Sequence, residues 1–276
     1  MTGPSLVAKG KTFTKTIGRR PMTLEQRVFD FFSDKRAYRG AIWAPWDIST
    51  LFQDANGTVP VTADGDPVRL MLDVSGNDAH WLAPSDLARP IYKGGAQPYL
   101  QGNGTSSEMV MVAAGLGITS FANEVSVQMG LLADSISLYR TILFIRTSSN
   151  NERLALGTGA SAGELRGRFR RNWSDTPATD VFLARPNGAH LWELYANYIG
   201  GEATLTRDVT AASGSSVLPE SQISEAAESA GTHLFGFSGT GFANMRFYGG
   251  IILASELDIT DQRADIAAYL AEKIGI

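Results

Sequence analysis

The chain of 276 residues contains no cysteine. It therefore has no disulfide framework, no thiolate zinc site and no cysteine nucleophile. Its three histidines lie far apart in the sequence, so no spacing typical of a zinc site occurs. The sequence also lacks a phosphate-binding P-loop and a dinucleotide-binding glycine pattern. The sequence therefore contains no motif typical of zinc binding, cysteine-based catalysis or nucleotide binding.

Long apolar runs are absent as well. No run of eighteen apolar residues occurs, so we expect no insertion into a membrane. The basic N-terminal residues are not followed by an apolar segment, so we expect no Sec export signal. Hydrophobic and charged contents of 43% and 19% are those of a globular protein. The 29 glycines favour a loop-rich β protein.

Charge is distributed unevenly along the chain. Residues 1–40 hold nine Lys and Arg against three Asp and Glu, whereas the remaining residues hold fifteen against twenty-five. A basic arm on an acidic body can dock on an acidic partner or on nucleic acid; a solvated tail is the alternative. The first twenty residues carry no acidic side chain and five basic ones, which are Lys9, Lys11, Lys15, Arg19 and Arg20.

Helical patterns occur near both ends. Thr23 and Gln26 fit a capping box, which predicts a short helix that ends near Ser33. At the other end Thr260 is a suitable N-cap, and Ile266, Leu270 and Ile274 lie on one face of the helix that would follow.

Between these helices the pattern is one of short strands and turns. Alternating or continuous apolar segments predict strands at residues 108–112, 125–131, 139–146, 153–156, 165–169, 181–184, 191–197, 233–237 and 245–253. Residues 211–230 are rich in Ser, Ala and Glu and are expected to form a surface loop. Many short strands separated by turn residues predict an all-β sandwich or jelly roll.

Two motifs resemble catalytic sequences. Residues 159–163 match the G-x-S-x-G pattern of a nucleophile elbow, but they lie where a hairpin loop is expected. Glu256, Asp258 and Asp261 resemble an E-x-D-x-x-E pattern of glycoside hydrolases, in which two carboxylates share one strand face. The same residues can instead lead into the final helix. We interpret residues 159–163 as a hairpin loop and Glu256 to Asp261 as the segment that leads into the final helix. We therefore expect no enzymatic activity.

The stretch from Leu72 to Trp81, LDVSGNDAHW, concentrates polar side chains. Asp73 and Ser75 are suited to accept hydrogen bonds from backbone amides in a turn, and Gly76 and Asn77 can supply positive φ angles. Loop carboxylates also bind calcium in some β-sandwiches, so Asp73 is a metal candidate together with Asp54 and Asp78. We expect no other cofactor.

A row of basic side chains is predicted on one strand. Arg166, Arg168 and Arg170 alternate along 165–169, which places their side chains on one face of the sheet, and Trp173 follows closely. Such a row can hold an acidic polysaccharide, a nucleic-acid backbone or an acidic neighbouring subunit. An ordinary solvated sheet face is the alternative. The tryptophans can stack on sugar rings where they are exposed, or anchor the core where they are not.

Several segments carry a family resemblance. They are Trp46 to Thr58, Pro60-Val-Thr62, Asp66-Pro-Val68, Leu72 to Asn77, Ala88 to Tyr92, Tyr99 to Gly104, Arg246 to Gly249 and Ile259 to Arg263, with Tyr269-Leu270 and Gly275. In this order they resemble bacteriophage and prophage virion proteins with a LamG or concanavalin A-like jelly roll. The resemblance spans residues 41–276. Residues 1–40 lie outside it and are interpreted as an attachment arm.

The resemblance implies a structural or adhesion role in a phage or phage-derived particle, as a head-spike, tail or fibre-associated subunit. Other virion proteins would be its partners, with several copies in one particle. The jelly roll would face outward and could bind bacterial surface polysaccharide. The alternatives are a polysaccharide-degrading enzyme on the same scaffold and an assembly protein without a ligand. Tyr99 to Gly104 lacks the aspartates that the family carries there, which weakens the case for calcium.

Overall fold

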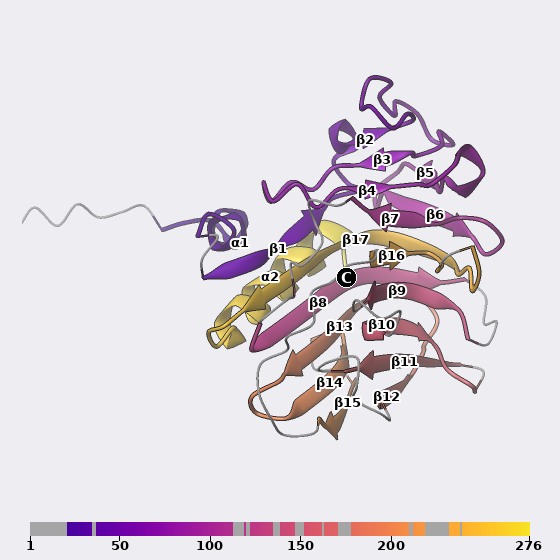
Figure 1. The fold of residues 1–276 in the computed structure, drawn as a ribbon. Coiled ribbons are helices and arrows are strands. Elements are labelled where there is room, and N and C mark those ends of the chain that lie inside the picture. Colours follow the sequence, from indigo (N-terminus) through magenta and orange to yellow (C-terminus); the bar gives the residue numbers. More distant parts are fainter. Residues whose placement is uncertain are drawn as a thin grey trace, which may run out of the picture.

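The computed structural model describes residues 21–34, 37–112, 119, 122–134, 139–146, 152–161, 163–170, 178–209, 212–218, 232–237 and 239–276. These residues form two antiparallel β-sheets packed face to face, with one helix near each end (Figure 1). The predicted all-β sandwich is therefore confirmed. Within the described ranges, no helix is long and apolar enough to cross a membrane.

The first sheet has the spatial order β15-β14-β13-β8-β17-β6-β5, and β1 pairs with the second half of β17. Its strands are β1 (Tyr38–Trp43), β5 (Ile91–Lys93), β6 (Tyr99–Asn103), β8 (Glu124–Ala133), β13 (His190–Asn197), β14 (Glu202–Arg207), β15 (Ala212–Val217) and β17 (Asn244–Ser255). β8 and β17 run side by side through the middle of this sheet.

The second sheet has the order β12-β11-β10-β9-β16-β7-β4-β3-β2. Its strands are β2 (Leu51–Phe52), β3 (Leu70–Met71), β4 (Trp81–Leu82), β7 (Met109–Met111), β9 (Thr141–Arg146), β10 (Glu152–Thr158), β11 (Glu164–Phe169), β12 (Thr179–Ala184) and β16 (Thr232–Leu234). Two short 3-10 helices, Ile48–Thr50 and Asp86–Ala88, lie in the loops that precede β2 and β5. Each of the nine strands expected from the sequence is present within a few residues of its predicted bounds.

The main core lies between the two sheets and contains three fully buried tryptophans, which are Trp43, Trp81 and Trp192. β17 has apolar neighbours on both of its faces. A register irregularity between Phe247 and Gly249 changes which side chains face the core. Phe247 packs between the sheets, whereas Ile251 packs against the helices. Because of this irregularity, alternate residues of β17 do not keep to one face along the whole strand.

Gly249 allows β17 to pass close to Trp43, at the end of β1, and to Trp46 in the loop that follows. Its φ of +136° is one that other residues rarely adopt. A Cβ atom at this position would overlap the ring of Trp46 and lie 2.9 Å from the carbonyl oxygen of Trp43. The glycine is thus required both for the backbone conformation and for the approach of β1.

Two helices cover the outer face of the first sheet (Figure 1). α2 (Thr260–Ile274) buries the predicted side chains Ile266, Leu270 and Ile274. Thr260 is the first helical residue and not the N-cap as expected. The N-cap is Ile259, whose side chain cannot accept a hydrogen bond, and the carboxylate of Asp258 just before it accepts the Thr260 N–H at 2.8 Å.

α1 (Leu24–Phe31) has the predicted capping box between Thr23 and Gln26. It packs on α2, where the guanidinium of Arg27 donates to both carboxylate oxygens of Asp265 at 2.8 and 2.9 Å. The helix is therefore docked on the sandwich, with Val28 fully buried.

Two expectations about chain organisation need correction. The boundary placed after residue 40 falls inside β1, whose backbone pairs with β17, because the sandwich uses this segment as one of its strands. The segment 211–230 was expected to be a loop, but Ala212–Val217 forms the edge strand β15 through backbone pairing with β14. Residues 219–231 lie outside the described ranges.

Candidate functional site

The stretch from Leu72 to Trp81 is the turn between β3 and β4 of the second sheet, and it is hydrogen-bonded to β1 of the first sheet. The Oδ1 atom of Asp73 accepts the Ile42 N–H and the Ser75 N–H, both at 2.9 Å. Its Oδ2 atom accepts the Ser75 hydroxyl at 2.8 Å and the backbone N–H groups of Asn77 and Ala79 at 3.2 Å. The turn role expected for Asp73 is confirmed. Positive φ angles occur at Gly76 and Asp78, and not at Asn77 as expected.

The three carboxylates named as metal candidates have separate surroundings. Asp54 accepts the Thr58 hydroxyl at 2.6 Å and the Val59 N–H at 2.8 Å, and these bonds lower the pKa of its carboxyl to about 2. Both oxygens of Asp73 are occupied by donors of its own turn, and Asp78 is exposed. In the described part of the chain, no group of three or more acidic or histidine side chains could hold a metal ion. The three carboxylates do not come together as one group in the structure.

Neither catalytic-like motif has the geometry that its chemistry needs. Gly159 and Ser161 lie in the hairpin between β10 and β11, as expected. Glu256 and Asp258 follow the last residue of β17, so they do not project from a strand. Hydrogen bonds from Thr260 lower the pKa of the Asp258 carboxyl, which acts as a helix cap. The interpretation of this segment as the lead-in to the helix is confirmed.

The predicted arginine row lies on the outer face of the second sheet. Along β11 the buried residues Leu165, Gly167 and Phe169 alternate with partly exposed ones, so Arg166 and Arg168 share the outer face. Arg168 donates to both oxygens of Asp180 on β12, at 2.8 and 3.0 Å. Arg166 and Arg170 also take part in polar or charged interactions. The row is therefore outward-facing as predicted, but its charge is partly neutralised.

Two exposed aromatic residues lie near this row. Phe182 on β12 pairs with Arg166 in register and is 47% exposed. Tyr139, which precedes β9, is 62% exposed, and its backbone N–H contacts the Gly159 carbonyl oxygen at 3.4 Å. A Cβ atom on Gly159 would lie 3.5 Å from the Phe182 ring, so both aromatic residues border this glycine.

We call this surface the arginine–aromatic face. It consists of Arg166, Arg168, Asp180, Phe182, Tyr139 and Gly159. Exposed rings can stack on the C–H face of a sugar, and guanidinium groups can donate paired hydrogen bonds to a carboxylate. In the described part of the chain, both helices lie against the other sheet, so no helix covers this face (Figure 1).

Only part of this face was predicted from the sequence. Arg166 and Arg168 followed from strand alternation, whereas Phe182 and Tyr139 were missed. Phe182 could have been identified from the sequence because it is an apolar residue at a position of the predicted strand 181–184 that faces outward. Trp173 and the basic residues Lys9, Lys11, Lys15, Arg19 and Arg20 lie outside the described ranges.

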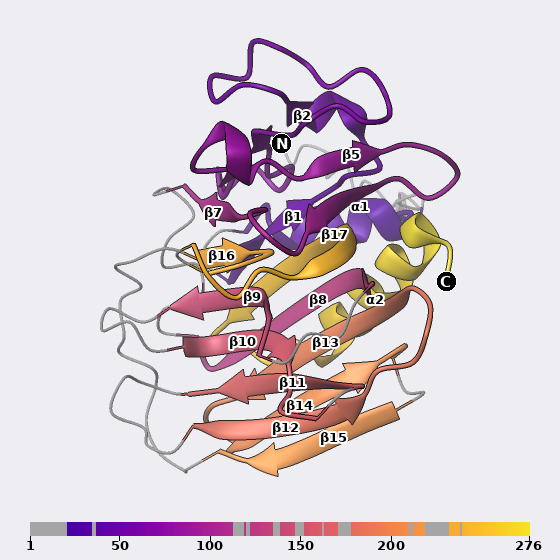
Figure 2. The same ribbon diagram turned by 90° about the vertical axis from the view of Figure 1, so that its right-hand side faces the viewer.

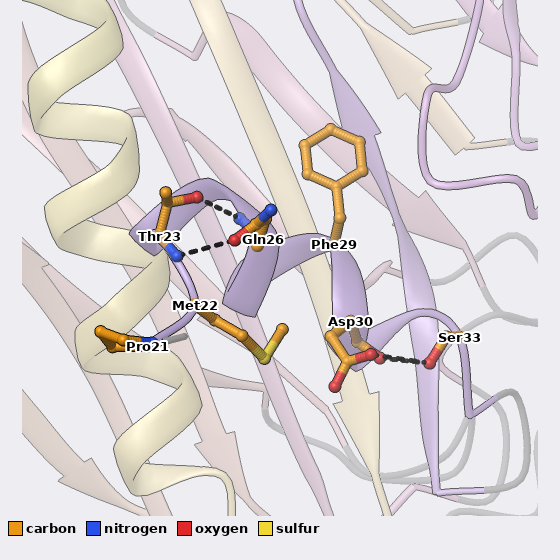
Figure 3. Close-up of a pocket in the computed structure, with 7 residues that line it drawn as sticks. All are labelled: Pro21, Met22, Thr23, Gln26, Phe29, Asp30 and Ser33. Carbon is orange, nitrogen blue, oxygen red and sulfur yellow. Dashed lines mark hydrogen bonds between the residues drawn. The ribbon is translucent and has the colours of Figure 1, made fainter. Parts of the chain in front are cut away.

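A groove of about 670 Å³ runs along the exposed side of α1. Its polar groups mainly bond to one another: Thr23 and Gln26 form the capping box, and the Ser33 hydroxyl donates to the Asp30 carbonyl oxygen at 2.7 Å (Figure 3). Met22, Phe29 and Pro21 supply its apolar surface. Because these polar groups stabilise the helix itself, the groove shows no arrangement aimed at a particular ligand.

No protein-family model matches the chain, and no curated protein matches it. Solved structures with a similar fold include the binding domain of botulinum neurotoxin DC in complex with SialylT, with a TM-score of 0.52 and 13% identity over 72% of this chain and 48% of that one. The same domain in complex with rat synaptotagmin II has a TM-score of 0.52 and 12% identity, over 82% and 51% of the two chains.

A structure of botulinum neurotoxin type C, concerning its interaction with two ganglioside molecules, matches with a TM-score of 0.51 and 14% identity over 82% of this chain and 51% of that one. The chain thus spans about half the length of these structures. At such identities the similarity concerns the fold, and it agrees with the β-sandwich described above.

Proposed function

We propose that this chain is a non-enzymatic binding component of a bacteriophage-type particle. In this proposal the arginine–aromatic face binds an acidic polysaccharide of the bacterial surface. The observation that carries it is the exposed Phe182 ring opposite Arg166, with the exposed Tyr139 next to Gly159, on the sheet face that no described helix covers. Rings and guanidinium groups together suit a ligand that is both a sugar and an anion.

Two further findings support this proposal. The segments that resemble phage virion proteins include Leu72 to Asn77 and Arg246 to Gly249, which in the structure form part of the turn between β3 and β4 and the bulged part of β17. The similar neurotoxin domains have been solved with SialylT and in connection with gangliosides. The second of these findings favours binding over catalysis.

The binding face can be tested with immobilised polysialic acid as the acidic probe and dextran as the neutral control. We expect Phe182→Ala and Tyr139→Ala each to weaken binding of polysialic acid on the order of tenfold, the equivalent of about 1.4 kcal/mol. Ile199→Ala is the matched control, because Ile199 is 61% exposed but follows β13 in the first sheet. Binding should also weaken as salt is raised.

Three results of this experiment would count against the proposed face. Equal binding by the Phe182 and Ile199 variants would remove the face as the site. Equal binding of dextran would exclude recognition of charge. If the unchanged protein bound neither probe, the ligand part of the proposal would be wrong and an assembly role would be favoured.

The particle context is tested separately through the basic residues of the N-terminus. We expect a variant without residues 1–20 to fold, because the described core begins with α1 and its contacts to α2. We also expect it to be absent from purified particles, since the five basic residues would no longer contact an acidic partner. Normal incorporation of the shortened chain would contradict the anchoring role.

A further inference from the structure

Three exposed apolar side chains lie at one end of the first sheet. They are Val217 at the end of β15, Ile199 in the turn after β13 and Leu257 after β17, and they are 77%, 61% and 53% exposed. Figure 2 shows the strands involved one above another in the sheet, from β15 through β14, β13 and β8 to β17. Three large apolar side chains that are mostly exposed at one end of a sheet indicate a contact surface.

Backbone pairing places the end of β15 beside the turn between β13 and β14. The Leu218 N–H donates to the Gly201 carbonyl oxygen at 2.8 Å. Val217 therefore lies next to the turn that carries Ile199.

Asn123, just before β8, connects the same turn to the segment after β17. Its carbonyl oxygen accepts the Tyr198 N–H at 2.8 Å, and its side-chain nitrogen donates to the Glu256 carbonyl oxygen at 2.6 Å. The residue before Ile199 and the residue before Leu257 therefore share one partner. With about 4.8 Å between neighbouring strands, the distance from β15 to β17 is about 19 Å.

The exposed charged side chains of this end are acidic. Glu202 is exposed and pairs in register with Val217. Glu256 and Asp258, on either side of Leu257, are exposed as well. No lysine or arginine occurs in the described segments that form this end, which are 123–124, 197–202, 217–218 and 255–258. We call the surface made by the three exposed apolar residues and these three acidic ones the acidic–apolar rim.

The rim favours an occupant that is both basic and apolar. Burial stabilises exposed apolar side chains, while the acidic groups around them attract cations and repel a surface of the same charge. Two rims would therefore not associate with each other. Residues 1–20 have the complementary composition, because they carry five basic side chains, no acidic one and the apolar residues Leu6, Val7, Phe13 and Ile17. At about 3.3 Å per residue, about six extended residues cover the rim, so this segment is long enough.

From these observations we propose that the acidic–apolar rim binds the basic N-terminal segment, residues 1–20, of a neighbouring copy of this chain. Lysine and arginine side chains of the segment contact the acidic residues of the rim, and its apolar side chains cover the exposed apolar ones. Each copy carries both a segment and a rim, so copies associate one after another. The inference rests on the anchoring role in the proposed function, and it identifies the acidic partner of the segment as another copy. It does not involve the arginine–aromatic face.

Self-association of the full chain can be measured by sedimentation velocity over a wide range of protein concentrations. We expect oligomers that increase with concentration and dissociate as salt is raised, because salt screens exposed charge pairs. Leu257→Ser should weaken association on the order of tenfold, since it removes an apolar side chain from the rim. Leu87→Ser is the matched control, because Leu87 is 84% exposed but lies in the 3-10 helix before β5.

A labelled peptide of residues 1–20 tests the identity of the occupant. We expect it to bind the full chain in fluorescence anisotropy, and an excess of the unlabelled peptide to dissociate the oligomers. A peptide with glutamine at the five basic positions is the control and should do neither. Glu256→Lys should weaken peptide binding on the order of tenfold. Glu272→Lys makes the same charge change at an exposed position near the end of α2 and should leave binding unchanged.

The results that would overturn this proposal are specific. A full chain that stays monomeric at every concentration would show that the segment does not bind a second copy. Equal association of the Leu257 and Leu87 variants would remove the rim as the site, and equal binding of the two peptides would refute the role of charge. The Leu257 variant should keep its binding of polysialic acid, which separates this site from the proposed ligand site. If the full chain were monomeric but the chain without residues 1–20 were absent from particles, the anchoring role would stand and the second copy would be rejected as its partner.

Discussion

Replacing Asp73 by asparagine tests whether this residue holds the two sheets together. The side chain is 7% exposed and accepts five hydrogen bonds, one of them from Ile42 on β1 of the first sheet. The remaining four come from its own turn in the second sheet. Asparagine has nearly the same shape, but one of its two terminal groups donates and cannot accept.

The cost can be worked out from the partners of each oxygen. If the amide nitrogen takes the place of Oδ1, the N–H groups of Ile42 and Ser75 lose their acceptor. If it takes the place of Oδ2, the Ala79 N–H loses its acceptor and the Asn77 N–H keeps only the Ser75 hydroxyl oxygen at 3.3 Å, while that hydroxyl can turn to accept. At least one backbone donor is therefore left without an acceptor, and a second is left with a weaker one. At about 1–3 kcal/mol for an unsatisfied group, we expect a loss of about 2–3 kcal/mol.

Asp78→Asn is the matched control, five residues away. It removes the same charge from an exposed side chain, and asparagine tolerates its positive φ of 58°. Urea unfolding followed by tryptophan fluorescence is a suitable assay, since Trp43 and Trp81 are packed 5.1 Å apart beside this turn. With a denaturant slope of about 3 kcal/mol per molar, the Asp73 variant should unfold at about 1 M less urea. Midpoints that agree between the two variants would refute this role for Asp73.

Two further predictions concern other carboxylates. Glu124→Ala should lower the free energy of unfolding by about 3 kcal/mol, because the buried carboxylate accepts the Tyr195 hydroxyl at 3.0 Å and the Ile259 N–H at 3.3 Å, just before α2; urea unfolding with the exposed Glu256→Ala as control checks this, and equal midpoints would contradict it. For Asp54, the folded-state pKa of about 2 lies below the ordinary value of 3.8, so its stabilising effect is complete above about pH 4 and is lost as the pH falls through about 2. An NMR titration of this carboxyl with a midpoint near 4 would contradict the bonding described for its loop.

Period-two patterns predicted several of the strands that have one buried and one exposed face, although β14 was missed. β11 is an example, since its buried and partly exposed residues alternate without interruption. β15 could not be found in this way, because its sequence ASGSSV has little intrinsic preference for strands. It becomes a strand through six backbone pairs with β14, and these depend on where the rest of the sheet lies. The bulge in β17 was hidden for the same reason, as it is a property of pairing with β8.

The candidate sites show the same division between local and non-local information. The direction of Arg168 follows from its own strand, but its neutralisation by Asp180 follows from the register between β11 and β12. The packing of α2 on the first sheet is harder still to foresee. Gln128 and Arg263, whose contact helps to form it, are 135 residues apart in the sequence. A local sequence pattern cannot reveal such a contact, because the contact forms only when α2 packs over β8.

The two outer faces of the sandwich differ in a way that bears on attachment. The described chain begins at Pro21, directly before α1, and α1 is held on α2 by the paired bonds between Arg27 and Asp265. α2 in turn covers the first sheet, whereas the arginine–aromatic face belongs to the outer side of the second. If residues 1–20 fix the chain to a particle as we propose, the helices would face the particle and the arginine–aromatic face would point away from it. Because α1 is docked and not hinged, replacing Arg27 by alanine should loosen this orientation without changing the binding face itself.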